Sequence, residues 1–209
     1  FIGKITTPET YLLSKKGGIR PEVIRQYQHI RPKTNLFASI FRIRSNLSFA
    51  VHQFFNKSGF FHLDPNVITT SDCEGAGEVF RITNFDFNRI PQKDDQVDYS
   101  KDFFKKEAFL TVSSQLQLEA LSSGLGNCYT TNPSFRAEKS NTSRHLACFT
   151  HVEYEMSFCD LNDLMDLSEC FVKYCIKYIL DHNKYDLENI NRFYTKGLID
   201  RLKHYLETK

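Results

Sequence analysis

The order of the hydrophobic patterns is the feature that most constrains the fold of this chain. Apolar residues recur at steps of three or four along residues 35–57 and again over 164–202, which is the period of an amphipathic helix. Between them lie short apolar segments, with a single helical pattern among them at 115–123; the predicted strands fall within 60–69, 79–83, 109–112, 128–138 and 149–158. Because most strands follow one another without a helix between them, the sequence predicts an α+β domain, an antiparallel sheet with helices packed on it.

Turn residues divide this pattern further. Residues 1–34 are rich in proline and glycine and are predicted to form a connector from an upstream region, and Gly59 is predicted to end the first long helix. Pro65 lacks an amide donor, so a strand at that position must lie at an edge or an interface. Residues 84–108 are polar and weakly periodic and are predicted to be a surface insertion. Residues 183–186 are predicted to interrupt the last helical stretch.

Composition limits the function classes. The 209 residues are 41% hydrophobic and 25% charged, which is ordinary for a globular domain, and no apolar run reaches the roughly 20 residues that span a bilayer. The net charge of +2 is too small to support nucleic-acid binding by itself. Six cysteines without a CxxC pair favour reduced thiols in an intracellular protein. We therefore expect a protein that does not enter a membrane.

One predicted hairpin carries groups suited to a nucleoside triphosphate. Arg136 and Glu138 are two residues apart and share a strand face, and the following loop carries Arg144 and His145 and ends at Phe149. Guanidinium groups bind phosphates in a bidentate way, a carboxylate suits an amine, and an aromatic ring can stack on a base. The plain alternative for Arg136 and Glu138 is an ion pair on a solvated sheet face.

Other signals are weaker. Glycine-rich phosphate-binding motifs of the P-loop and dinucleotide types are absent from the sequence, so an ATP site here must rely on side chains. The loop from Glu74 to Glu78 could be a mobile lid that brings a carboxylate to a substrate amine, or a plain turn. His145, Cys148 and His151 have metal-like spacing, but strand alternation places the last two on opposite faces, which argues against zinc.

Taken together, these segments resemble the class II aminoacyl-tRNA synthetases, and most closely the bacterial or organellar asparaginyl-tRNA synthetase family. The matching segments extend over nearly the whole sequence: His29–Thr34, Ser71–Glu78, Leu110–Leu116, Phe135–Ala147 and Phe158–Leu161. The resemblance implies a six-stranded antiparallel sheet flanked by helices. In this interpretation residues 1–34 follow an absent anticodon-binding OB-fold, and residues 35–209 form a partial catalytic domain with motifs 1 and 2 but not motif 3.

The resemblance also implies an activity, which is the activation of asparagine with ATP and Mg²⁺ to asparaginyl-adenylate, followed by transfer to tRNA(Asn). It implies a homodimer with Pro65 at the interface, a cytoplasmic location or alternatively the mitochondrial matrix, and metal ligands outside this chain. Arg136 would hold the α-phosphate as the catalytic residue. The other implied ATP-binding residues are Glu138, Arg144, His145 and Phe149, and the implied asparagine-binding residues are Glu74, Ser113, Gln115 and Glu153.

Three positions depart from the family pattern. The family usually has glycine at Ser114, glutamate at Cys148 and proline at Tyr154. The sequence also ends before motif 3, so these 209 residues alone are expected to be inactive as an asparagine–tRNA ligase. Two alternatives stay open at this stage: a non-catalytic or truncated synthetase paralogue, and a tRNA-independent amide synthetase that forms an adenylate.

Overall fold

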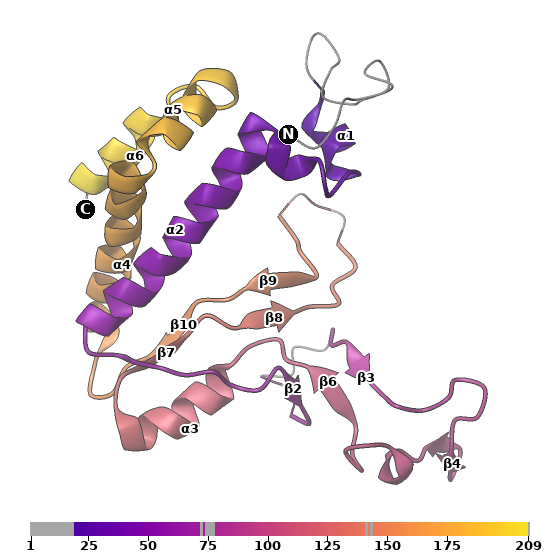
Figure 1. The fold of residues 1–209 in the computed structure, drawn as a ribbon. Helices are drawn as coiled ribbons and strands as arrows, with labels where there is room; N and C mark the ends of the chain where they lie inside the picture. Colours follow the sequence, from indigo (N-terminus) through magenta and orange to yellow (C-terminus); the bar gives the residue numbers. More distant parts are fainter. Residues whose placement is uncertain (1–18, 72, 74–77, 141, 143, 209) are drawn as a thin grey trace, which may run out of the picture. The chain divides into compact units, whose positions relative to one another are not determined.

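The fold is that of a computed structural model, which describes residues 19–71, 73, 78–140, 142 and 144–208 (Figure 1). The chain divides into two compact units. Unit 1 contains the residues up to Phe54 together with those from Met165 onward, and unit 2 contains Phe55–Leu164. The mixture of helices and small sheets confirms the predicted α+β class.

Helices dominate the described part of unit 1. They are α1 (Pro21–Arg25), the 3₁₀ turn η2 (Arg31–Lys33), α2 (Asn35–Lys57), α4 (Leu161–His182), α5 (Lys184–Phe193) and α6 (Leu198–Glu207), of which α2 ends and α4 begins inside unit 2. The predicted helix over 35–57 is confirmed at both ends, and Gly59 follows it with a φ of +80°, which favours glycine. The apolar period therefore fixed this helix correctly.

Apolar and ionic contacts hold unit 1 together. Ile24, Ile30 and Phe37 form a buried cluster that joins α1 to α2. Arg42 of α2 binds Asp186 of α5, with 2.6 Å between Nη2 and Oδ1. Burial raises the pKa of Asp186, but hydrogen bonds from Arg42 and neighbouring polar groups outweigh burial, so the net pKa is lowered and the carboxylate stays ionised.

The helix boundaries near the end of the chain correct the prediction. The expected break at 183–186 is a single residue, Asn183, because α5 begins at Lys184. Asp186 lies in the first turn of α5 and accepts a hydrogen bond from the Asn183 side chain at 3.2 Å, as acidic residues favour helix starts. The single pattern predicted from residue 187 is two helices, because Gly197, with a φ of +75°, separates α5 from α6.

Unit 2 contains the strands, which form four small sheets among the described residues. Their orders are β1-β7-β10, β2-β6-β3, β4-β5 and β8-β9, and every pairing is antiparallel except β1 with β7. The strands are β1 (Phe61–His62), β2 (Ile68–Thr69), β3 (Arg81–Ile82), β4 (Gln92–Lys93), β5 (Gln96–Val97), β6 (Ala108–Leu110), β7 (Cys128–Thr130), β8 (Pro133–Phe135), β9 (Cys148–Thr150) and β10 (Glu153–Glu155). The predicted strand segments are thus present but shorter, and the one continuous sheet that was expected is divided.

Helix α3 (Gln115–Leu125) packs against β7 and β10 of unit 2 (Figure 1). An aromatic cluster supports the same strands. The Phe55 ring, which is fully buried, stacks on Tyr129 of β7 at 4.6 Å between centroids and lies 5.2 Å from Tyr154 of β10. This cluster packs against β7 and β10, and residues of β10 line the cavity described below.

The predicted surface insertion over 84–108 contains the β4-β5 hairpin, the 3₁₀ turn η3 (Tyr99–Lys101) and the start of β6. Most of its residues are at least partly exposed, but Asp102 is buried. Its carboxylate accepts hydrogen bonds from the amides of Asn84 at 2.9 Å and Phe103 at 2.8 Å, which joins the two ends of the insertion. Within the described residues, none of the helices has the length and apolar character needed to cross a membrane.

Candidate active site

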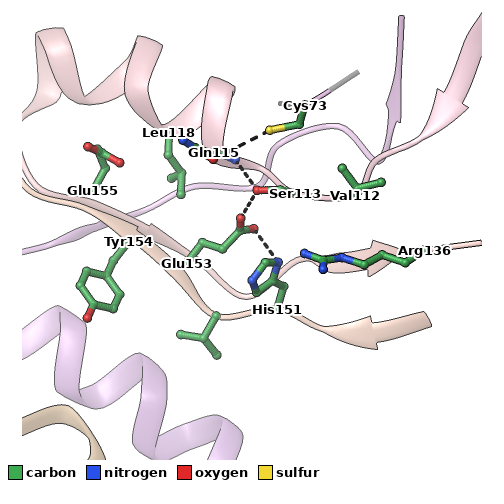
Figure 2. A pocket seen from close by; sticks show the side chains of 11 residues that line it. Cys73, Val112, Ser113, Gln115, Leu118, Arg136, His151, Glu153, Tyr154 and Glu155 are labelled. Atoms are coloured by element: carbon green, nitrogen blue, oxygen red, sulfur yellow. Dashed lines mark hydrogen bonds and ion pairs between the residues drawn. The ribbon is translucent and has the colours of Figure 1, made fainter. Parts of the chain in front are cut away.

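A cavity of about 620 Å³ lies in unit 2 between the start of α3 and the end of the β8-β9 hairpin (Figure 2). Four residues predicted for the site line it, which are Ser113, Gln115, Arg136 and Glu153. The other lining residues are Cys73, Val112, Leu118, His151, Val152, Tyr154 and Glu155. The cavity therefore places one predicted phosphate-binding arginine and three predicted amino-acid-binding residues around the same space.

Glu153 is the most strongly held polar side chain of this cavity. Its side chain is only 12% exposed, and its carboxylate accepts a hydrogen bond from the Ser113 hydroxyl. The backbone amide of Ser114 lies 3.2 Å and 3.0 Å from the two carboxylate oxygens. His151 Nδ1 is 3.4 Å from Oε2 (Figure 2). The carboxylate is thus held by the two residues that precede α3, at the helix end where backbone amides lack partners within the helix.

The backbone at Ser114 can hold a serine, although the asparaginyl-tRNA synthetase family usually has glycine at this position. It is 1% exposed and has φ −93° and ψ 8°, a conformation open to any L-residue. The Asn132 side-chain amide lies 3.4 Å from the Ser114 hydroxyl oxygen and 2.6 Å from the Pro65 carbonyl oxygen. The extra hydroxyl therefore causes no backbone strain and joins a polar chain that reaches Pro65, between β1 and β2.

Gln115 and Glu155 complete the wall formed by α3 and β10. The Gln115 side-chain amide donates to Glu119 at 2.9 Å, and its carbonyl oxygen lies 3.9 Å from the Cys73 sulfur. Burial, and then repulsion from Glu119, raise the pKa of Glu155. This wall of the cavity is consequently acidic and suited to a cationic group.

The β8-β9 hairpin supplies the opposite, basic side. Strand β8 ends at Phe135, one residue before Arg136, so the strand predicted as far as 138 is wrong in its last three residues. The reason is visible in the backbone: the Ala137 amide donates to the Glu78 carbonyl at 2.7 Å instead of to the partner strand. The Arg136 guanidinium carbon lies 5.7 Å from the centre of the Phe149 ring, within cation–π range.

The outer part of the hairpin holds the remaining predicted nucleotide-binding residues. Glu138 lies 3.7 Å from Arg136 and 3.6 Å from His145, and all three side chains are between 38% and 48% exposed. The ion pair that was the plain alternative for Arg136 and Glu138 is therefore present. Arg144 is also exposed, and its backbone amide lies 3.4 Å from the Thr142 hydroxyl. Glu138, Arg144, His145 and Phe149 do not line the cavity.

Several sequence predictions differ from this geometry or are not tested by it. Glu74 lies outside the described residues, so its predicted contact with the amino acid has no structural counterpart here. The predicted strand from 149 to 158 is interrupted at His151 and Val152, so the alternation argument does not apply across that break. His151 lines the cavity beside Glu153. The sequence raised a metal-ligand role for His151, but its even spacing with Glu153 and Glu155 also predicts that these side chains share one face. Among the described residues, no group of three or more His, Cys, Asp or Glu could hold a metal ion.

The comparison with known families identifies the class. A family model for class II tRNA synthetases (D, K and N) matches residues 20–205. This chain therefore belongs to the class II tRNA synthetases.

Individual relatives narrow the resemblance. The chain is 48% identical to an asparagine–tRNA ligase of Cytophaga hutchinsonii over 98% of its own length, and 48% identical to that of Protochlamydia amoebophila over 99%. It covers 44% of each of these proteins, so the chain spans less than half the length of the curated relatives it matches. The asparaginyl-tRNA synthetase of Pyrococcus horikoshii, solved with asparaginyl-adenylate, superposes with a TM-score of 0.74 at 29% identity, covering 94% of this chain and 40% of that one.

Proposed function

We propose that the protein to which this chain belongs is an asparagine–tRNA ligase. It activates asparagine with ATP to asparaginyl-adenylate and then transfers the asparaginyl group to tRNA(Asn). The observation that carries the proposal is that Arg136 and the restrained carboxylate of Glu153 line opposite sides of the same cavity. A cation and an anion so arranged suit the phosphate and the ammonium group of one aminoacyl-adenylate. The similarity to asparagine–tRNA ligases over nearly the whole chain supports the choice of asparagine.

In the first step, a carboxylate oxygen of asparagine attacks the α-phosphorus of ATP. A new carbon–oxygen–phosphorus link forms, the bond between the α-phosphorus and the bridging oxygen breaks, and pyrophosphate leaves. Arg136 neutralises the charge that grows on the α-phosphate oxygens, because a guanidinium binds two oxygens of one phosphate in parallel. The reaction needs no acid or base from the protein, so the chain acts by orientation and charge neutralisation. In the second step, the terminal tRNA hydroxyl attacks the activated carbonyl and AMP leaves.

The nucleotide side of the site consists of Arg136, Glu138, Arg144, His145 and Phe149. Adenine would stack on the Phe149 ring beside the Arg136 guanidinium, 5.7 Å from the ring centre. Arg144 and His145 would bind the outer phosphates, and Glu138 would accept from the adenine amine or contact the end of the tRNA. The exposed positions of Glu138 and His145 leave them accessible to ATP.

The amino-acid side consists of Ser113, Gln115, His151 and Glu153. Glu153 would bind the ammonium group of asparagine, since its carboxylate faces the cavity and is restrained by the start of α3. Ser113 restrains that carboxylate, and Gln115 would bind the substrate by its side-chain amide. Glu74 would add a second carboxylate near the same ammonium group.

The remaining assignments belong to the same proposal. Mg²⁺ accompanies the phosphates of ATP, with protein ligands expected beyond this chain. The protein forms a homodimer with the Pro65 segment at the interface, and the Asn132 side chain connects the Pro65 carbonyl to Ser114 of the site. It acts in the cytoplasm, with the mitochondrial matrix as the alternative.

The departures from the family pattern do not remove a charged group from the cavity. Tyr154 turns its ring into the cluster with Phe55 and Phe60, and Ser114 adopts an unstrained backbone. Cys148 is exposed and pairs with Phe135 in the hairpin. The placements of Tyr154 and Ser114 are compatible with the catalytic interpretation, whereas Cys148 removes an acidic group next to Phe149 on the nucleotide side.

The direct test is exchange of pyrophosphate into ATP by the full-length protein, followed by charging of tRNA(Asn). We expect exchange that depends on asparagine and is much weaker with aspartate, together with formation of asparaginyl-tRNA. Exchange without tRNA charging would favour the amide synthetase alternative. Absence of exchange with purified, folded protein would favour the non-catalytic paralogue and contradict the proposal.

A further inference from the structure

We propose that His151 is a positioning residue for asparagine binding, which holds the second oxygen of the Glu153 carboxylate through a hydrogen bond from Nδ1. The inference rests on the proposed function, because it assigns a role within the asparagine-binding side of that site. His151 lies between β9 and β10 and lines the cavity together with Arg136 and Glu153 (Figure 2).

The contacts of His151 fix both its backbone and its ring. Its backbone amide donates to the Asn132 carbonyl at 2.8 Å. Its Nδ1 atom lies 3.1 Å from the hydroxyl oxygen of Ser134, a fully buried residue of β8, and 3.4 Å from Oε2 of Glu153. Its ring centre is 5.5 Å from that of Phe149. The ring is thus confined between the hairpin and β10, with one nitrogen directed toward two oxygens.

The role proposed for His151 requires a proton on Nδ1. An ionised carboxylate can only accept, so a bare Nδ1 lone pair 3.4 Å from Glu153 would be repelled. A proton on Nδ1 turns the contact into an attraction, and the Ser134 hydroxyl can share it as a second acceptor. The proposed contact with Glu153 therefore requires the Nδ1-protonated form, in which the Ser134 hydroxyl accepts; in the other tautomer that hydroxyl donates to Nδ1. The 3.4 Å separation exceeds an ordinary N–H···O distance, and hydrogen bonds of this kind shorten when substrate closes the site.

The effect on Glu153 follows from the division of donors between its two oxygens. Among the described residues, Oε1 receives the Ser113 hydroxyl and lies 3.2 Å from the Ser114 amide, while Oε2 has that amide at 3.0 Å and His151. With donors on both oxygens the carboxylate plane cannot rotate freely, so its open lone pairs keep one direction. A binding group that is already oriented loses less entropy when the ammonium group arrives.

A purely structural role for His151 is the competing explanation, since the ring also fills space beside Ser134 and Phe149. Substitutions at this position separate the two. An asparagine side chain places an amide nitrogen close to the position of Nδ1, whereas glutamine places it nearer Nε2 and leucine supplies no donor. His62 provides a matched control, because its Nδ1 is also near a carboxylate, that of Asp64 at 3.9 Å, but it does not line the cavity.

The experiment measures pyrophosphate exchange by the full-length protein and its variants, with KM determined separately for asparagine and for ATP. We expect His151→Leu and His151→Gln to raise the asparagine KM by about tenfold and to leave the ATP KM within about twofold, because a hydrogen bond to a charged group is lost. His151→Asn is expected to restore the asparagine KM to within about threefold of the wild type, since it returns a donor to Oε2. His62→Leu should change neither KM.

The outcomes separate the inference from the function on which it rests. If the wild type exchanges pyrophosphate but the leucine and asparagine variants have equal asparagine KM values, the positioning role is wrong and the proposed function stands. An equal rise in both KM values would indicate a structural role and would overturn the inference as well. If the folded wild type shows no asparagine-dependent exchange, both fail together.

Discussion

The amino-acid side and the nucleotide side of the proposed site differ in how far they are organised before substrate binds. On the amino-acid side, Glu153 is 12% exposed and is held by Ser113 and Ser114 at the start of a helix. On the nucleotide side, Glu138 and His145 are 38% and 48% exposed and are paired with each other at 3.6 Å. In the proposed function, a restrained and largely buried carboxylate would select one small substrate, whereas exposed ion pairs would exchange partners when ATP enters. Selection of the amino acid would then depend on fixed geometry, and ATP binding on charge.

The largest expected effect is at Arg136, the residue of the nucleotide side that lines the cavity. Arg136→Ala is predicted to lower kcat/KM for adenylate formation by about 10²–10³-fold, because it removes the cation at the developing charge of the α-phosphate. Arg136→Lys keeps the charge but cannot bind two phosphate oxygens in parallel, so its kcat/KM should lie between those of the wild type and the alanine variant. Pyrophosphate exchange by the full-length protein measures both variants. Near-normal exchange by the alanine variant would remove the role assigned to Arg136.

The next prediction compares the two sides directly. Glu153→Gln is expected to raise the asparagine KM by about 10- to 100-fold, since a restrained charge that binds an ammonium group is lost. Glu138→Gln, on the exposed side, is expected to change the ATP KM by less than about fivefold, as exposed ion pairs contribute little. The same exchange assay gives both values. A larger effect at Glu138 than at Glu153 would reverse the comparison.

How much of this was predictable from the sequence depends on whether local or long-range contacts set the structure. The helix Asn35–Lys57 was predicted at both ends, because a long apolar period and a following glycine are local signals. The end of β8 at Phe135 was not predicted. There the Ala137 backbone amide donates to the carbonyl of Glu78, a residue distant in the sequence, instead of to the partner strand. The division of the sheet into four parts has the same origin, since strand pairing is set by distant segments.

The candidate site shows the same limit. Arg136 was predicted from the hairpin pattern, and Ser113, Gln115 and Glu153 through the family resemblance; all four lie around one cavity. The even spacing of His151 and Glu153 predicts that they share a face, and both line the cavity although the strand is interrupted at His151. The hydrogen-bond partner of His151, Ser134, is on another strand, so no local spacing could have indicated the contact.

A third prediction concerns the packing that supports the restrained side. Tyr154→Ala is expected to lower the free energy of unfolding by about 2–3 kcal/mol, because the Tyr154 ring packs against Phe55 at 5.2 Å and Phe60 at 6.4 Å between ring centres. Tyr154→Phe keeps the ring and serves as the control. Denaturant unfolding of the full-length protein measures the difference. Equal stability of the two variants would show that the cluster does not support β10.

The smallest expected effect is a pH dependence. The pKa of Glu155 is raised by burial and by Glu119, so the folded state holds this proton more tightly than the unfolded chain. Ionising Glu155 therefore destabilises the fold, and the cost appears as the pH rises above the ordinary value of 4.5. Glu155→Gln is expected to raise stability near pH 7 by less than about 1 kcal/mol and to have no effect below that ordinary value. Melting temperatures at both pH values check the sign, and a stabilisation confined to low pH would contradict it.

The most direct measurement of the central claim is a crystal structure of the full-length protein with bound asparaginyl-adenylate. The account predicts the substrate ammonium group within hydrogen-bond distance of Glu153 and the α-phosphate beside Arg136. It also predicts that the Glu153 carboxylate stays within about 1 Å of its present position, as in a preformed site, while Glu138 and His145 separate. An asparaginyl group bound away from Glu153, or a Glu153 that turns while the Glu138–His145 pair stays closed, would contradict it.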